Sequence, residues 1–208
     1  MAYETEEQQV EAIKNFWKEN GSAIILGAII GFGGLFGWRY YQDQQRVQAE
    51  QASEAYAAAM QSIQAGQTEN PQFVEQANQL IKDYADSSYA SMAALKLAQQ
   101  YVEQNKLDEA AEQLRWVADK GNSTYKATAT IRLARVLLQQ EKFAEAVTVA
   151  KSVTADAHQA TSKYIQAEAL LGQDKKDEAI AMFKQAKEAS EGFTSPLLAL
   201  RLTEFGIE

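Results

Sequence analysis

The sequence predicts an all-α protein in which one membrane-spanning helix is followed by an array of helix pairs. Three observations predict this fold class. The 208 residues include 36 alanines but only 2 prolines and 11 glycines, a composition that favours helix. An uncharged apolar stretch lies near the start of the chain, and a short motif recurs at a nearly constant interval after it.

The uncharged stretch runs from Asn20 to Trp38, over 19 residues. As a helix with a rise of about 1.5 Å per residue it reaches about 28 Å, which matches a bilayer core of about 30 Å. Aromatic and basic residues flank both ends, as they do at membrane interfaces: Phe16, Trp17, Lys18, Trp38, Arg39, Tyr40 and Tyr41. A cleaved signal peptide would have a shorter apolar core and a small-residue cleavage site. The sequence therefore predicts an acidic tail over 1–19, a transmembrane helix over 20–41 and a repeat domain over 42–208.

Small residues form one face of the predicted transmembrane helix. At about 100° per residue, Ala23, Gly27, Gly31 and Gly34 fall on the same side. A ridge of this kind lets another transmembrane helix approach closely. Glycine is also generally enriched in membrane helices, so the pattern leaves both interpretations open.

The flanking charges do not determine how this helix is oriented in the membrane. Lys14 and Lys18 lie on one side, and Arg39 and Arg46 lie on the other. The basic residues that set topology are therefore equal in number on the two sides.

The motif Asp/Ala-Glu-Ala occurs three times after the apolar stretch. It ends at Ala110, Ala146 and Ala179, at spacings of 36 and 33 residues. Periods near 34 residues are typical of tetratricopeptide repeats, in which each repeat is a pair of helices. Small residues meet where the two helices of such a pair cross. Each motif alanine has a matching alanine 12 positions earlier: Ala98, Ala134 and Ala167.

The hydrophobic pattern predicts where the helices of this array begin and end. The predicted pairs are 88–104 with 107–119, 124–140 with 142–153, and 157–171 with 175–190. An atypical first pair combines the continuation of the membrane helix with a helix opened by Pro71, after a longer connection from Ala65 to Asn70. Ser195-Pro196 predicts a terminal helix that covers the last core face. The whole region is predicted to be a tetratricopeptide-like helical-repeat solenoid.

Composition argues against several classes of function. The net charge of −8 provides no basic surface for nucleic acid. The chain has no cysteine and one histidine, His158, which excludes thiolate chemistry and two-histidine metal sites. We expect no catalytic residues, no metal and no cofactor, and we interpret His158 as part of a polar surface turn.

Tetratricopeptide solenoids generally bind partners on a concave surface lined by the first helix of each pair. The polar residues predicted on this surface are Gln99, Glu103, Arg135, Gln139, Tyr164 and Glu168. Their mixed charges indicate an extended peptide or a protein surface as the partner. Domains that clamp the C-terminal carboxylate of cytosolic chaperones need lysine and asparagine where this chain has Leu95, Gln99 and Ile131, which argues against that partnership.

The acidic tail, the anchor from Glu19 to Gln45 and the repeat segment from Leu97 to Leu114 resemble the YfgM family of Gram-negative bacteria. The resemblance covers essentially the whole chain, and its most specific parts are Gly21, Gly27, Gly37-Trp38-Arg39-Tyr40 and Leu97-Ala98-Gln99-Gln100. It implies an ancillary subunit of the SecYEG translocon that is anchored in the inner membrane and has no catalytic residues. It also implies a cytoplasmic N-terminus and a periplasmic repeat domain.

The resemblance further implies a set of partners. The family associates with the membrane-anchored periplasmic chaperone PpiD, passes emerging secretory polypeptides toward periplasmic chaperones, and has been linked to a stress-response regulator. We therefore expect a non-enzymatic adaptor between SecYEG and chaperones such as PpiD, with unfolded secretory polypeptides as further partners. The alternative is a membrane-tethered scaffold that sequesters a stress-response regulator.

Overall fold

The structure is a computed structural model that describes residues 6–63, 70–190, 192 and 194–207. These residues form α-helices and one short 3₁₀ helix, with no strand among them, so the all-α prediction is confirmed. The chain divides into two compact units, Met1–Glu50 and Gln51–Glu208. The long helix α1 (Glu6–Ser62) contributes residues to both units.

The first unit contains the N-terminal part of α1. Because this helix begins at Glu6, residues 6–19 of the predicted tail are helical, and residues 1–5 lie outside the described part. Most side chains along the apolar stretch are exposed. Within the described residues, α1 is the helix that is long and apolar enough to cross a bilayer. The predicted N-terminal candidate span is thus confirmed, whereas its limits at residues 20 and 41 stay a prediction.

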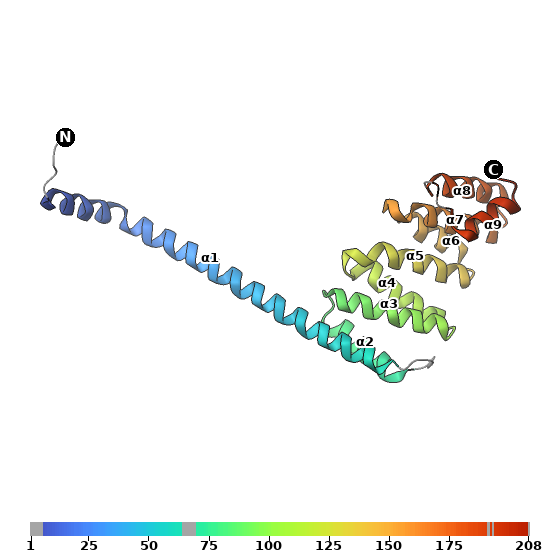
Figure 1. Cartoon of the computed structure of the whole chain (residues 1–208), viewed down its shortest axis with the longest axis horizontal. Coiled ribbons are helices and arrows are strands. Elements are labelled where there is room, and N and C mark those ends of the chain that lie inside the picture. The colour runs from blue at the N-terminus through green and yellow to red at the C-terminus, as the bar shows by residue number, and fades with distance from the viewer. Residues whose placement is uncertain (1–5, 64–69, 191, 193, 208) are drawn as a thin grey trace. The chain divides into compact units, whose positions relative to one another are not determined.

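The second unit is an array of helix pairs joined by short turns. The pairs are α3 (Ser88–Glu103) with α4 (Leu107–Lys120), α5 (Ser123–Gln139) with α6 (Phe143–Lys151), and α7 (Gln159–Gly172) with α8 (Lys176–Glu188). Successive pairs also contact each other, and Figure 1 shows α3 to α8 stacked in chain order. These bounds agree with the three predicted pairs to within two residues at every end.

Additional helices lie at both ends of this array. α2 (Pro71–Asp83) shares a core cluster with α3 and with the last part of α1, and α9 (Pro196–Glu204) packs on α7 and α8. Each begins with proline, as predicted. The side chains of Asn70 and Ser195 cap them by accepting hydrogen bonds from the backbone N–H groups of Phe73 at 2.9 Å and Leu198 at 3.3 Å. Residues 65–69 of the predicted connection lie outside the described part of the chain.

Small residues lie at the predicted helix crossings. The six alanines are each at most 2% exposed: Ala98, Ala110, Ala134, Ala146, Ala167 and Ala179. The first pair and the third pair each belong to one shared core cluster, whereas Ala134 and Ala146 belong to two neighbouring clusters. Interiors are close-packed, so a larger side chain at these positions would force the helices apart.

The three turns inside the pairs share one backbone conformation. Asn105, Glu141 and Asp174 have left-handed φ angles of 59°, 59° and 60°. The lysine that follows each donates its backbone N–H to the carbonyl oxygen five residues earlier, at 2.8, 2.9 and 2.9 Å. This is the Schellman helix end, whose left-handed residue is usually glycine. The turn therefore repeats with the same spacings as the motif, although its residues are not glycine.

A close contact fixes the junction between the first two pairs. The buried Ser91 hydroxyl of α3 accepts a hydrogen bond from the backbone N–H of Asn122 at 2.8 Å. A Cβ atom at Gly121 would lie 2.6 Å from the carbonyl oxygen of Val117 and 2.9 Å from the Ser91 hydroxyl oxygen. The turn between α4 and α5 therefore needs glycine here because the backbone passes so close to its neighbours.

The third pair differs from its prediction at the start. The 3₁₀ helix η1 (Asp156–His158) precedes α7, and the His158 N–H bonds to the carbonyl oxygen of Ala155 at 2.9 Å. This tighter turn holds His158 at the junction of the two helices, where it is half-buried. The predicted surface turn at His158 is thus present as a 3₁₀ helix, in which His158 is partly exposed.

Candidate functional site

Two cavities flank α5 on the side formed by the first helix of each pair. We call the exposed surface of α3, α5 and α7 the first-helix face. The α3–α5 cavity has a volume of about 420 Å³, and its apolar walls come from Leu95, Ala98, Val102, Leu114 and Val136. The α5–α9 cavity has a volume of about 550 Å³ and lies among α5, α7, the end of α8 and the start of α9.

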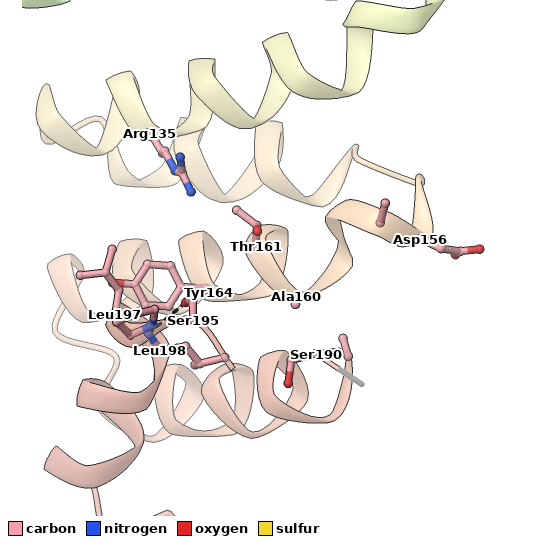
Figure 2. Close-up of a pocket in the computed structure, with 12 residues that line it drawn as sticks. Arg135, Asp156, Ala160, Thr161, Tyr164, Ser190, Ser195, Leu197 and Leu198 are labelled. Atoms are coloured by element: carbon pink, nitrogen blue, oxygen red, sulfur yellow. Dashed lines mark hydrogen bonds between the residues drawn. The ribbon is translucent and has the colours of Figure 1, made fainter. Parts of the chain in front are cut away.

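Arg135 lines both cavities. Figure 2 shows its side chain extending from α5 toward Thr161 and Tyr164 of α7, with Leu197 and Leu198 of α9 nearby. Asp156 lines the opposite end of the same cavity, and its side chain points away from Arg135. Arg135 therefore lies between the mainly apolar α3–α5 cavity and the α5–α9 cavity, whose lining is partly polar and partly apolar.

The structure brings together most of the polar residues predicted for the first-helix face. Gln99, Arg135 and Gln139 line the α3–α5 cavity, and Tyr164 lines the α5–α9 cavity. Glu103 is exposed beside them and accepts a hydrogen bond from Gln99 Nε2 at 2.8 Å. Their role in binding stays a prediction.

Glu168 is held by an ion pair. Arg201 of α9 donates from Nε to Glu168 Oε1 at 2.7 Å and from Nη2 to Glu168 Oε2 at 2.9 Å. The Glu168 and Arg201 side chains are 17% and 33% exposed. Glu168 lines neither cavity; it attaches α9, whose Leu197 and Leu198 line the α5–α9 cavity, to α7.

Tyr164 lies beside this ion pair. Burial raises the pKa of Tyr164 to about 12, and its hydrogen bond to Glu168 acts in the same direction. The ring also packs against Phe183, with 5.9 Å between the ring centroids. Tyr164 is therefore part of the support of the cavity as well as of its lining.

The sequence analysis missed Arg132 and the leucines of α9 as lining residues. Arg132 precedes Arg135 by three positions and lines the α3–α5 cavity with it. The helical spacing of the two arginines was a signal that could have found this residue. The terminal helix was predicted to cover the last core face, but the sequence pattern did not indicate that Leu197 at its start would line a cavity with Arg135.

The small-residue ridge of α1 is open in the structure. A Cβ atom built at Gly27, Gly31 or Gly34 would meet no atom within 4 Å, and Ala23 is exposed. This surface is available to a second helix, and its use for packing stays a prediction.

A metal site would need several ligating side chains close together in the described part of the chain. Within these ranges no group of three or more histidine, cysteine, aspartate or glutamate side chains could hold an ion. The prediction of a chain without metal or cofactor is not tested by this observation.

Comparison with known proteins supports the combination of span and repeats. A family profile described as a tetratricopeptide repeat-like domain matches residues 14–206. An ancillary SecYEG translocon subunit of Aggregatibacter actinomycetemcomitans is 32% identical over 97% of this chain and 98% of that protein. The chain belongs to the family of ancillary SecYEG translocon subunits.

Two further members of the family align with part of the chain. The ancillary SecYEG translocon subunits of Escherichia coli strain K12 and Haemophilus influenzae are 41% and 36% identical over 54% and 55% of this chain. These alignments cover 53% and 55% of the two relatives, so in them the chain spans about half of each relative's length. The predicted family resemblance is confirmed.

Proposed function

We propose that the chain is a non-enzymatic adaptor, anchored in the inner membrane and associated with the SecYEG translocon. The observation that carries this proposal is the similarity over nearly the whole chain to a relative named as an ancillary translocon subunit. An apolar helix long enough to anchor the chain and a helical-repeat unit with two cavities on one face support it. In this role the repeat unit links emerging secretory polypeptides to periplasmic chaperones such as PpiD.

An anchored adaptor gains from its attachment to the membrane. Two weak contacts, one through the anchor and one through the repeat unit, combine because the first raises the effective concentration for the second. Affinity for each partner alone can then remain low enough for release. This arrangement suits a protein that passes a polypeptide from a channel to a chaperone.

Topology tests the proposal. In sealed spheroplasts, protease added from outside should digest the repeat unit and leave a fragment that contains the apolar helix. The alternative is a scaffold that holds a cytosolic stress-response regulator, and it predicts a repeat unit that is cleaved only in inverted vesicles. Protection of the repeat unit in spheroplasts would therefore reject the adaptor.

The anchor is proposed to contact a transmembrane helix of the translocon or of a chaperone through its small-residue ridge. Gly27→Leu with Gly31→Leu would block close approach of a second helix, so we expect lower co-purification of SecYEG and PpiD. Ile25→Leu with Ile29→Leu is the matched control, because it keeps the helix equally apolar. Equal recovery of partners with both variants would show that the ridge has no role in assembly.

A further inference from the structure

The arginines of the second unit differ in whether they have an acidic partner. Arg115 pairs with Glu145, and Arg201 pairs with Glu168 and Glu204. Arg132 and Arg135 are both exposed, and neither forms an ion pair or hydrogen bond with any described side chain. Two cations of α5 are therefore left without anions in a chain with a net charge of −8.

These two arginines lie on the same surface. Residues three positions apart on a helix are neighbours, with about 5–6 Å between their Cβ atoms. Both arginines line the α3–α5 cavity, whose remaining polar lining residues are the uncharged amides Gln99 and Gln139. Like charges on neighbouring positions of a helix repel each other, and an anion bound to both arginines removes that repulsion and accepts charge-assisted hydrogen bonds.

Apolar surface lies on both sides of this pair. On one side are the apolar walls of the α3–α5 cavity, and on the other is Leu197 of α9 in the α5–α9 cavity. Among the described residues that follow Val47, the large apolar side chains that are mostly exposed are Leu197, at 61%, and Leu200, at 65%. Isolated exposed leucines are unremarkable, but Leu197 lines the same cavity as Arg135 and leaves most of its side chain open to a ligand there.

We propose that the first-helix face binds an extended polypeptide segment in which one carboxylate side chain lies between two apolar side chains. The carboxylate binds Arg132 and Arg135, and the apolar side chains enter the α3–α5 and α5–α9 cavities. This inference deepens the proposed function and rests on it only for the source of the segment.

The spacing of the cavities fits an extended chain. Packed helices are about 8–10 Å apart, and an extended chain advances about 3.3 Å per residue with alternate side chains on one face. Residue i+2 can therefore place an acidic side chain over α5, while residues i and i+4 place apolar side chains in the cavities on either side of it. The recognised pattern is apolar-x-acidic-x-apolar, with free choice at the residues between.

The test measures binding of defined peptides to the purified full chain in detergent micelles, by fluorescence anisotropy. The probes are fluorescein-labelled nonapeptides with blocked C-termini, leucine at the third and seventh positions, and serine elsewhere except at the fifth. The fifth residue is glutamate, glutamine or lysine. We expect the glutamate peptide to bind about tenfold more tightly than the glutamine peptide.

Variants of Arg132 and Arg135 test whether these two residues cause the preference for the glutamate peptide. Arg132→Gln with Arg135→Gln should bring the glutamate and glutamine peptides to equal affinity. Arg115→Gln with Lys120→Gln removes the same net charge outside both cavities and should keep the tenfold ratio. Arg135→Glu should bind the lysine peptide most tightly, a gain that unfolding cannot produce. Leu197→Ser should weaken all three peptides by the same factor.

Several results would overturn the inference. They are equal binding of the glutamate and glutamine peptides to the unaltered chain, no binding of any peptide, or a tenfold ratio that survives removal of both arginines. Unchanged binding by Leu197→Ser would overturn the placement of the second apolar side chain. Because no translocon or chaperone is present, such a failure leaves the proposed function standing, and that function fails separately in the spheroplast experiment.

Discussion

The ion pair between Glu168 and Arg201 allows a quantitative test of how α9 is attached. The change is Glu168→Gln, Arg201→Met, or both, in a soluble fragment that begins at Gln42. Two charge-assisted hydrogen bonds of 2.7 and 2.9 Å join these side chains across 33 residues of sequence. The two single variants leave different groups behind, so their costs should differ.

Glu168→Gln leaves Arg201 with a second acceptor. Arg201 Nη1 also donates to Glu204 Oε2 at 2.7 Å, so its charge stays paired, and we expect a loss of about 1 kcal/mol in the free energy of unfolding. Arg201→Met instead leaves the Glu168 carboxylate, which is only 17% exposed, with the Tyr164 hydroxyl as its remaining partner. A mostly buried charge without a counterion should cost about 2–3 kcal/mol.

Urea unfolding of the four proteins provides the measurement. Trp116 is the only tryptophan in the fragment, so its fluorescence reports on α4, while circular dichroism reports on the helices as a whole. The double-mutant cycle should give a coupling energy of about 1–2 kcal/mol. A coupling energy near zero, or a larger loss for Glu168→Gln than for Arg201→Met, would refute this account of the contact.

Three further predictions concern packing, junctions and pH. Ala146→Leu should lower the free energy of unfolding by about 1–3 kcal/mol, because the larger side chain overpacks a helix crossing. The same change at the exposed Ala144 should leave the free energy of unfolding nearly unchanged. Equal urea midpoints for the two variants would argue against the crossing. Ser91→Ala should cost about 1–2 kcal/mol, because it leaves the backbone N–H of Asn122 without its acceptor, and a thermal melt unchanged from the parent would contradict this. Because the pKa of Tyr164 is raised to about 12 from an ordinary value of 10.0, stability that is fully present below pH 10 should be lost as the pH rises toward 12. Tyr164→Phe should lack this part of the pH dependence, and parallel profiles for the two proteins would show that Tyr164 does not cause it.

The repeat could be predicted because its determinants are local. The motif alanines and their partners 12 positions earlier are all buried, and the helix limits follow from apolar periodicity and from Pro71 and Pro196. Asn105 and Asp174 are residue types that favour a positive φ, but glutamate at position 141 carries no such signal, so the common left-handed form of the three turns could not be predicted. Their conformation is imposed by the packing of the two helices that each turn joins.

The candidate site was predicted less completely than the fold. Gln99, Arg135, Gln139 and Tyr164 follow from their positions on the first helices, and the structure places them in the two cavities. The pairing of Glu168 with a residue of α9 depends on how the chain returns after α8, which periodicity does not determine. Sequence reasoning therefore predicts the face of a helix, while the contacts of its charges require the tertiary structure.

The shared backbone of the turns at Asn105, Glu141 and Asp174 makes the chain modular. In each turn a left-handed residue is followed directly by lysine. A segment that begins with one of these lysines can therefore follow any of the left-handed residues, and the junction keeps the same turn. A second copy of residues 142–174, inserted after Asp174, has such a junction at both ends. The array would grow by one pair of helices and the first-helix face by one helix, so internal duplication offers this architecture a direct route to a longer surface.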